Sequence, residues 1–159
     1  MIDVFNNFYK GKRVLVTGHT GFKGSWLSIW LHELGAEIVG VALDPFTERD
    51  NFVLSGIGKK MVADIRADIR DGQKIKEIFA LYQPEIVFHL AAQPLVRLSY
   101  EQPVETYETN VMGTINIMEA IRAIKSVKVG VMVTTDKCYD NNEQLEGYVE
   151  TDPFGGYDP

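Results

Sequence analysis

The sequence is poor in cysteine, which limits the kinds of site it can build. Its 159 residues include a single cysteine, Cys138. An internal disulfide and a metal site made from several cysteines are therefore excluded, and we expect no bound metal and a reducing compartment.

Positive charge and long apolar runs are scarce as well. Acidic residues outnumber basic ones by 22 to 16, and the net charge of −6 argues against broad attraction to nucleic acid or to membranes. No apolar run approaches the roughly 20 residues of a membrane span, and residues 1–10 lack the basic segment and apolar run of a signal peptide. We expect a cytoplasmic protein with neither a nucleic-acid nor a membrane partner.

The residues that are present suit one ordinary globular domain. Hydrophobic residues make up 45% of the chain and charged residues 24%, which is enough apolar material for a real core. No internal repeat, low-complexity tract or linker divides the chain, so residues 1–159 are expected to form a single domain.

Apolar segments alternate with amphipathic ones along the chain. Predicted strands cover Arg13–Thr17, Ile38–Ala42, Met61–Asp64, Ile86–Leu90 and Val129–Thr134. Helical spacing of apolar residues predicts helices over Ser25–Leu34, Gly72–Tyr82 and Pro103–Ile124, the last with Val111, Ile115, Met118 and Ile121 on one face. We expect Pro45–Lys60 to be a loop with a short helical turn. This alternation predicts a doubly wound α/β fold with a parallel sheet covered on both faces.

Three glycines lie between the first predicted strand and the first predicted helix. Gly18 would permit a tight turn, Gly21 would let a pyrophosphate approach the backbone, and Gly24 would allow close packing of the helix. Free N–H groups at the helix start, together with the helix dipole, would then hold the phosphates. This context favours dinucleotide binding, with a purely structural turn as the alternative.

Polar residues follow the other predicted strands, at the edge where a dinucleotide binds to such a sheet. Asp44 is expected to accept hydrogen bonds from an adenosine ribose and to favour NAD over NADP, because it would repel a 2′-phosphate; a solvated loop carboxylate is the alternative. Three more stretches lie at this edge: Asp68–Asp71, Leu90–Gln93 and Thr134–Lys137. A packed strand end and a capped polar turn are the structural alternatives for the last two.

Five motifs together carry a family resemblance. They are Thr17-Gly-His-Thr-Gly-Phe-Lys-Gly24, Asp68-Ile-Arg-Asp71, His89-Leu-Ala-Ala92, Asn110-Val-Met-Gly-Thr114 and Thr134-Thr-Asp136. In these motifs the chain resembles the extended short-chain dehydrogenase/reductase superfamily, and within it the nucleotide-sugar 4,6-dehydratases. Lys137 stands where the dehydratases of dTDP-glucose and GDP-mannose carry glutamate. The resemblance implies a Rossmann-type fold, NAD as cofactor and CDP-glucose as substrate.

The resemblance also assigns residues to roles. The implied cofactor-binding residues are Gly18, His19, Thr20, Gly21, Phe22, Lys23, Gly24, Asp44, Asp68, Ile69, Leu90, Ala91, Ala92, Gln93, Asn110 and Thr134. In the implied reaction the sugar is oxidised at C4, loses water across C5 and C6, and is reduced again at C6. Thr135 would bond the 4-hydroxyl, Asp136 would protonate the departing 6-hydroxyl, and Lys137 stands at the position of the base. A lysine base requires a pKa lowered by burial or by a nearby cation.

Two features depart from the family pattern. His19 occupies a position in the glycine loop that is usually small or polar; contact with the phosphates is one interpretation, and an exposed loop histidine is the alternative that such a position favours. The family's Tyr-x-x-x-Lys pair does not occur, since Tyr157 precedes the matching position. We therefore expect the amino-terminal half of a dehydratase, truncated before the last strands and the sugar-nucleotide domain, and inactive alone.

Family likeness further implies a homodimer or higher homo-oligomer formed through Pro103–Ile124. Two other functions stay open. One is a sugar-nucleotide 4-epimerase or reductase of the same superfamily, although an epimerase needs no acid for a 6-hydroxyl. The other is a non-catalytic cofactor-binding module.

Overall fold

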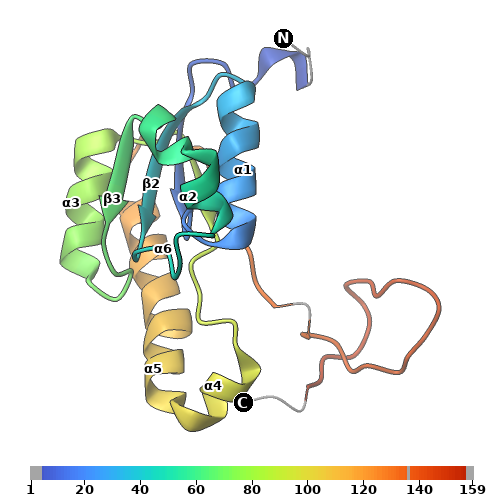
Figure 1. Ribbon diagram of the computed structural model, residues 1–159. Helices are drawn as coiled ribbons and strands as arrows, with labels where there is room; N and C mark the ends of the chain where they lie inside the picture. The colour runs from blue at the N-terminus through green and yellow to red at the C-terminus, as the bar shows by residue number, and fades with distance from the viewer. Residues whose placement is uncertain (1–4, 136, 157–159) are drawn as a thin grey trace.

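A computed structural model describes residues 5–135 and 137–156 (Figure 1). Asp136 and Tyr157, both of which the sequence analysis singled out, lie outside the described residues. In the described part of the chain no helix is both long and apolar enough to cross a membrane.

Five parallel strands form one sheet in the order β3-β2-β1-β4-β5. The strands are β1 (Arg13–Thr17), β2 (Glu37–Ala42), β3 (Ala63–Arg66), β4 (Ile86–His89) and β5 (Val129–Met132). Thr17 at the end of β1 lies level with Val41 of β2 on one side and His89 of β4 on the other. The strand order reverses between β1 and β4, and the predicted doubly wound α/β fold is confirmed.

Helices cover both faces of the sheet. They are α1 (Phe22–Glu33), α2 (Asn51–Ser55), α3 (Gly72–Tyr82), α4 (Val96–Glu101), α5 (Pro103–Tyr107) and α6 (Thr114–Ala123), with short 3-10 turns η1 (Phe5–Asn7) and η2 (Ile57–Lys60). A π-helical segment, η3 (Glu108–Gly113), joins α5 to α6, so the predicted helix from Pro103 is one helical run with a widened middle turn.

The core has two layers because alternate strand residues point to opposite faces. On one face Leu15, Val41 and Val87 pack with residues of α3 and α6, including Phe79 and Ile117. On the other face Val14, Val16, Ile38 and Ile86 pack with Leu31 of α1. Figure 1 shows α3 and α1 on either side of the sheet.

The long helix turns a different face to the sheet than its apolar stripe suggests. Ile117 and Ala120 are fully buried, whereas Val111, Ile115 and Met118 of the predicted stripe are 46%, 43% and 54% exposed. These three residues therefore lie on the outer surface of the molecule, whereas Ile121, the fourth residue of the predicted stripe, is partly buried and packs against the core.

Other differences from prediction are local. β3 begins two residues later than expected. By contrast, α3 has the predicted bounds, Gly72–Tyr82. The short helix α4 was not predicted. In the tail, the ring of Tyr139 stacks on Tyr148 and on Phe154, with centroid distances of 5.4 Å and 5.7 Å.

Candidate functional site

The carboxyl edge of the sheet gathers the predicted site residues that the structure describes. The glycine loop follows β1, Asp44 follows β2, Asp68 and Ile69 follow β3, Leu90–Gln93 follow β4, and Thr134, Thr135 and Lys137 follow β5. Because all five strands run parallel, these segments share one edge, centred on the reversal of strand order between β1 and β4. Figure 1 shows this common direction for the labelled strands.

The glycine loop is a tight turn in which two glycines are sterically required. Gly18 has a φ of +72°, and a Cβ there would lie 2.8 Å from the backbone nitrogen of Ala91. A Cβ on Gly24 would lie 2.1 Å from the carbonyl oxygen of Gly18. Gly24 therefore lets α1 pack directly against the turn, as its position predicted.

Gly21 keeps the start of α1 open. It is the N-cap residue, it has an extended backbone, and no side chain caps the helix. Phe22 and Lys23 follow in the first turn and are exposed. Uncapped N–H groups at the positive end of a 12-residue helix, next to a residue without a side chain, form a backbone cradle that fits a phosphate.

Hydrogen bonds attach the glycine loop to neighbouring strands. The N–H of Gly18 donates to the carbonyl of Val41 at 2.8 Å, and the hydroxyl of Thr20 donates to the carbonyl of Leu43 at 3.0 Å. The loop is thus fixed to the segment that carries Asp44.

A buried chain of hydrogen bonds connects β1, β4 and the long helix. The hydroxyl of Thr17 lies 2.7 Å from Nδ1 of His89, and Nε2 of His89 lies 3.0 Å from the hydroxyl of Thr114. Thr114 donates its own proton to the carbonyl of Asn110, so Nε2 of His89 must carry the proton and Nδ1 must accept from Thr17. Burial lowers the pKa of His89, in agreement with this neutral tautomer.

Asn110 continues this chain to the loop after β4. Its side-chain oxygen accepts from the N–H of Gln93 at 2.8 Å, and its amide donates to the carbonyl of Gln93 at 3.0 Å. Asn110 lies in the π-helical segment η3, a type of irregularity that is frequent at functional sites. Asn110 thus positions the loop Leu90–Gln93.

His19 does not face the open edge of the sheet. Its side chain is fully buried, its Nε2 lies 2.7 Å from Oδ1 of Asp64, and its ring meets that of Phe52 edge-on at 5.2 Å. Gly40 makes room for the ring, since a Cβ there would approach it to 2.6 Å. The exposed-histidine alternative was wrong, because the side chain is buried among Asp64, Phe52 and Gly40. Contact of His19 with a phosphate stays a prediction.

Asp44 lies at the end of β2 with its side chain 86% exposed. It accepts a hydrogen bond from Nε of Arg66 at 3.0 Å. Arg66 also binds both carboxylate oxygens of Asp64. Asp64 and Arg66 were not among the predicted site residues. They alternate with Ala63 and Ile65 along β3, a pattern that the predicted strand Met61–Asp64 did not include in full.

The loop after β3 is attached to the long helix. Arg70 forms ion pairs with Asp68 and with Glu105, and Asn116 donates to the carbonyl of Ile69 at 2.9 Å. Desolvation raises the pKa of Asp68, but hydrogen bonds from Arg70 outweigh it, and the net shift is downward. Asp68 is therefore ionised at neutral pH.

The predicted catalytic stretch follows β5. Thr134, Thr135 and Lys137 are exposed, and the N–H of Lys137 donates to the hydroxyl of Thr135 at 3.0 Å. The burial that a lysine base requires is thus not provided at Lys137 by residues 5–135 and 137–156. Among these residues no group of three histidine, cysteine, aspartate or glutamate side chains could hold a metal ion.

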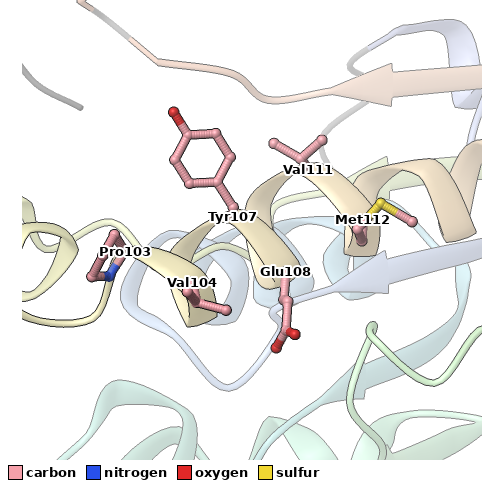
Figure 2. Close-up of a pocket in the computed structure, with 6 residues that line it drawn as sticks. All are labelled: Pro103, Val104, Tyr107, Glu108, Val111 and Met112. Carbon is pink, nitrogen blue, oxygen red and sulfur yellow. The ribbon is translucent and has the colours of Figure 1, made fainter.

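A groove of about 410 Å³ lies elsewhere, on the outer face of the long helix. Figure 2 shows the six side chains that line it projecting from one helical run: Pro103, Val104, Tyr107, Glu108, Val111 and Met112. It lacks the glycine-loop and strand-end residues and is almost wholly apolar, so it is a poor site for a charged cofactor.

The parallel sheet, the glycine turn after β1 and the polar loops at the carboxyl edge define a Rossmann-type domain of the extended short-chain dehydrogenase/reductase class. A solved UDP-glucose 4-epimerase of Thermus thermophilus, in complex with NAD, aligns with a TM-score of 0.78 and 32% identity, covering 92% of this chain and 45% of that one. A UDP-glucose-4-epimerase from Stenotrophomonas maltophila, with bound NAD and formylated UDP-arabinopyranose, aligns with a TM-score of 0.78 and 26% identity. The alignment covers 92% of this chain and 44% of that one.

Sequence relatives narrow the class to a family. Residues 15–159 match the family model of GDP-mannose 4,6 dehydratase, and the chain belongs to this family of nucleotide-sugar dehydratases. It is 56% identical to CDP-glucose 4,6-dehydratase of Salmonella typhimurium over all 159 residues, which is 44% of that protein. The chain thus spans less than half the length of these relatives.

Proposed function

We propose that this chain is the NAD-binding part of a CDP-glucose 4,6-dehydratase, which converts CDP-glucose to CDP-4-keto-6-deoxyglucose. The observation that carries the proposal is 56% identity to such an enzyme over the full 159 residues. The shared carboxyl edge of the five strands supports it, because the predicted site segments that follow the strands meet there, and Asn110 of the long helix bonds one of them at Gln93.

The cofactor would lie across this edge. The backbone of the glycine loop and the start of α1 would hold the pyrophosphate, Asp44 would accept from the adenosine ribose, and the loops at Asp68 and Leu90–Gln93 would line the rest of the site. Bound there, NAD would supply the reversible oxidation of the sugar at C4.

The residues after β5 would act on the sugar. The hydroxyl of Thr135 would hydrogen-bond the 4-hydroxyl of the substrate and orient it. Asp136 would donate a proton to the departing 6-hydroxyl, and Lys137 would act near C5. Because these 159 residues contain no Tyr-x-x-x-Lys pair, we expect no turnover of CDP-glucose by this chain alone.

Two further properties belong to this proposal. We place the protein in the cytoplasm, because its single cysteine suits a reducing compartment. We also expect a homodimer formed through the exposed apolar stripe of the long helix, where Tyr107, Val111 and Met118 are each about half exposed.

A 4-epimerase is the second candidate, since the two structural neighbours described above are UDP-glucose 4-epimerases. Asp136 and Lys137 favour the dehydratase, because epimerisation at C4 needs no acid for a 6-hydroxyl. The identity to the dehydratase, 56%, also exceeds the 32% and 26% to these epimerases.

The experiment that tests the proposal is calorimetric titration of the chain with NAD. Wild type should bind NAD, and Gly21→Val should abolish binding, because the valine would fill the phosphate cradle. Its Cβ would lie 3.3 Å from the carbonyl oxygen of Gly18, a tight contact that a small shift of the loop relieves. Gly147→Val is the matched control, since a Cβ there meets no atom within 4 Å. A folded wild-type protein that does not bind NAD would refute the proposal.

A further inference from the structure

The cationic side chain of Arg66 lies beside Asp44. A cation at this place would attract the 2′-phosphate of NADP and so oppose the preference for NAD. Arg66 ends β3 and lies directly opposite Ala42, the last residue of β2. Its guanidinium reaches Asp44 through Nε at 3.0 Å. An arginine near the end of the second strand is the residue type that accommodates a 2′-phosphate in NADP-binding domains of this fold.

Arg66 is already engaged by other groups. Nη1 and Nη2 bind the two carboxylate oxygens of Asp64 in a bidentate ion pair. The face of its guanidinium lies over the ring of Phe52, with Cζ 5.3 Å from the ring centroid. A bidentate pair fixes both the direction and the charge of a guanidinium.

Asp64 is itself held in place. Nε2 of the buried His19 donates to Oδ1 of Asp64 at 2.7 Å, and Gly58 approaches so closely that a Cβ there would lie 2.8 Å from Oδ2. Desolvation raises the pKa of Asp64, but the hydrogen bonds from Arg66 and His19 lower it by a larger amount. The pKa of Asp64 therefore lies below its ordinary value.

The charges of this cluster sum to a negative value. Asp44 and Asp64 contribute two negative charges, Arg66 contributes one positive charge, and burial lowers the pKa of His19 so that its ring is neutral. A phosphate on the ribose 2′-oxygen would meet a net negative cluster whose guanidinium is committed to Asp64.

We propose that Asp64 is a positioning residue that sets the preference for NAD over NADP, by holding the Arg66 guanidinium in a bidentate ion pair away from the ribose 2′-position. The inference rests on the proposed function of the carboxyl edge as a dinucleotide site. The carboxylate of Asp44 repels a 2′-phosphate directly. Asp64 binds the guanidinium of Arg66, so that this cation does not pair with the 2′-phosphate.

The test compares the ratio of the NADP and NAD dissociation constants, measured by calorimetry, in wild type and Asp64→Asn. The substitution preserves shape and removes one negative charge, so the Nη1 and Nη2 groups of Arg66 lose their ion pair and can turn to a 2′-phosphate, while Nε keeps its hydrogen bond to Asp44. A new charge-assisted contact of this kind predicts a fall in the ratio of about tenfold or more, mainly through tighter NADP binding. Glu37→Gln is the matched control, because it removes the carboxylate partner of Arg13 at the opposite end of the sheet; its ratio should equal that of wild type.

Arg66→Gln gives an independent test that does not require Asp64→Asn to fold. Because wild-type Arg66 is held by Asp64, its removal should lower the NADP affinity by much less than about tenfold, through the added net negative charge alone, whereas the double variant Asp64→Asn with Arg66→Gln should lose the gain. A tenfold loss of NADP affinity in Arg66→Gln would overturn the inference, as would an unchanged ratio in Asp64→Asn that still binds NAD. If folded wild type binds neither dinucleotide, the proposed function fails and the inference with it; binding of NAD with an unaltered ratio overturns the inference alone.

Discussion

At the scale of single residues, the hydroxyl of Thr17 joins three segments at a fully buried position. It donates to Nδ1 of His89 and accepts from the N–H groups of Leu90 and Ala91, each at 3.1 Å. One small side chain thereby fixes the ends of β1 and β4 where the strand order reverses.

Thr17→Val keeps the shape of this side chain and removes the hydroxyl. Two partly buried amides and a ring nitrogen would lose this partner, and the N–H of Leu90 would keep only its longer bond of 3.3 Å to the carbonyl of Thr17. We expect a loss of about 1–3 kcal/mol in the free energy of unfolding, measured by chemical denaturation. Thr151→Val is the control, because Thr151 is exposed and should cost less than about 0.5 kcal/mol. Equal effects of the two substitutions would contradict this role for Thr17.

The two buried histidines predict how stability depends on pH. Burial lowers the pKa of His19 and His89 below the ordinary value of 6.5, so the unfolded chain binds protons more readily than the folded one. Stability should be fully present above pH 6.5 and should fall below it, by at most about 1.4 kcal/mol per pH unit for each histidine. Asp64 and Asp68 have pKa values lowered below the ordinary aspartate value. The stability that their ionised forms contribute is therefore lost only at a pH below that ordinary value. Unfolding curves at pH 7.5, 6.5 and 5.5 test this; a constant free energy of unfolding across them would contradict it.

At the scale of elements, the contact between α1 and the glycine turn leaves no room for a side chain. Gly24→Ala would place a methyl group 2.1 Å from the carbonyl oxygen of Gly18, so the helix must move away from the turn. We expect a loss of about 1–3 kcal/mol in unfolding free energy and weaker NAD binding. Gly147→Ala is the matched control in open space, and equal stability of the two variants would show that α1 does not depend on this contact.

The sequence predicted the elements well where local patterns decide them. The strands were predicted from their runs of apolar residues. Helix α3 was predicted from the helical spacing of its apolar residues, and Asp71 caps it by accepting a hydrogen bond from the N–H of Lys74. The sequence did not predict features that depend on contacts between distant segments. The π-helical turn depends on the bonds of Asn110 to Gln93, and the burial of His19 depends on Gly40 and Asp64, which are distant in sequence.

At the scale of the whole molecule, the long helix leaves apolar surface uncovered. Val104 is 70% exposed, Tyr107 58% and Met118 54%, and these side chains share the helix with the groove of Figure 2. Several exposed apolar side chains on one helix are typical of an interface between proteins.

Met118→Glu should therefore shift the chain from dimer toward monomer, because a buried unpaired carboxylate is costly at an interface. Sedimentation equilibrium measures the dissociation constant, and we expect it to rise at least tenfold. Leu81→Glu introduces the same charge at an exposed apolar residue of α3 and should have no effect. A wild-type chain that is monomeric at all concentrations would refute the proposed dimer.

A crystal structure of this chain grown with NAD would show whether the carboxyl edge of the sheet is the dinucleotide site. We expect the pyrophosphate at the N–H groups that start α1 and the adenosine ribose beside Asp44. NAD bound anywhere else, for example in the groove of the long helix, would refute this assignment.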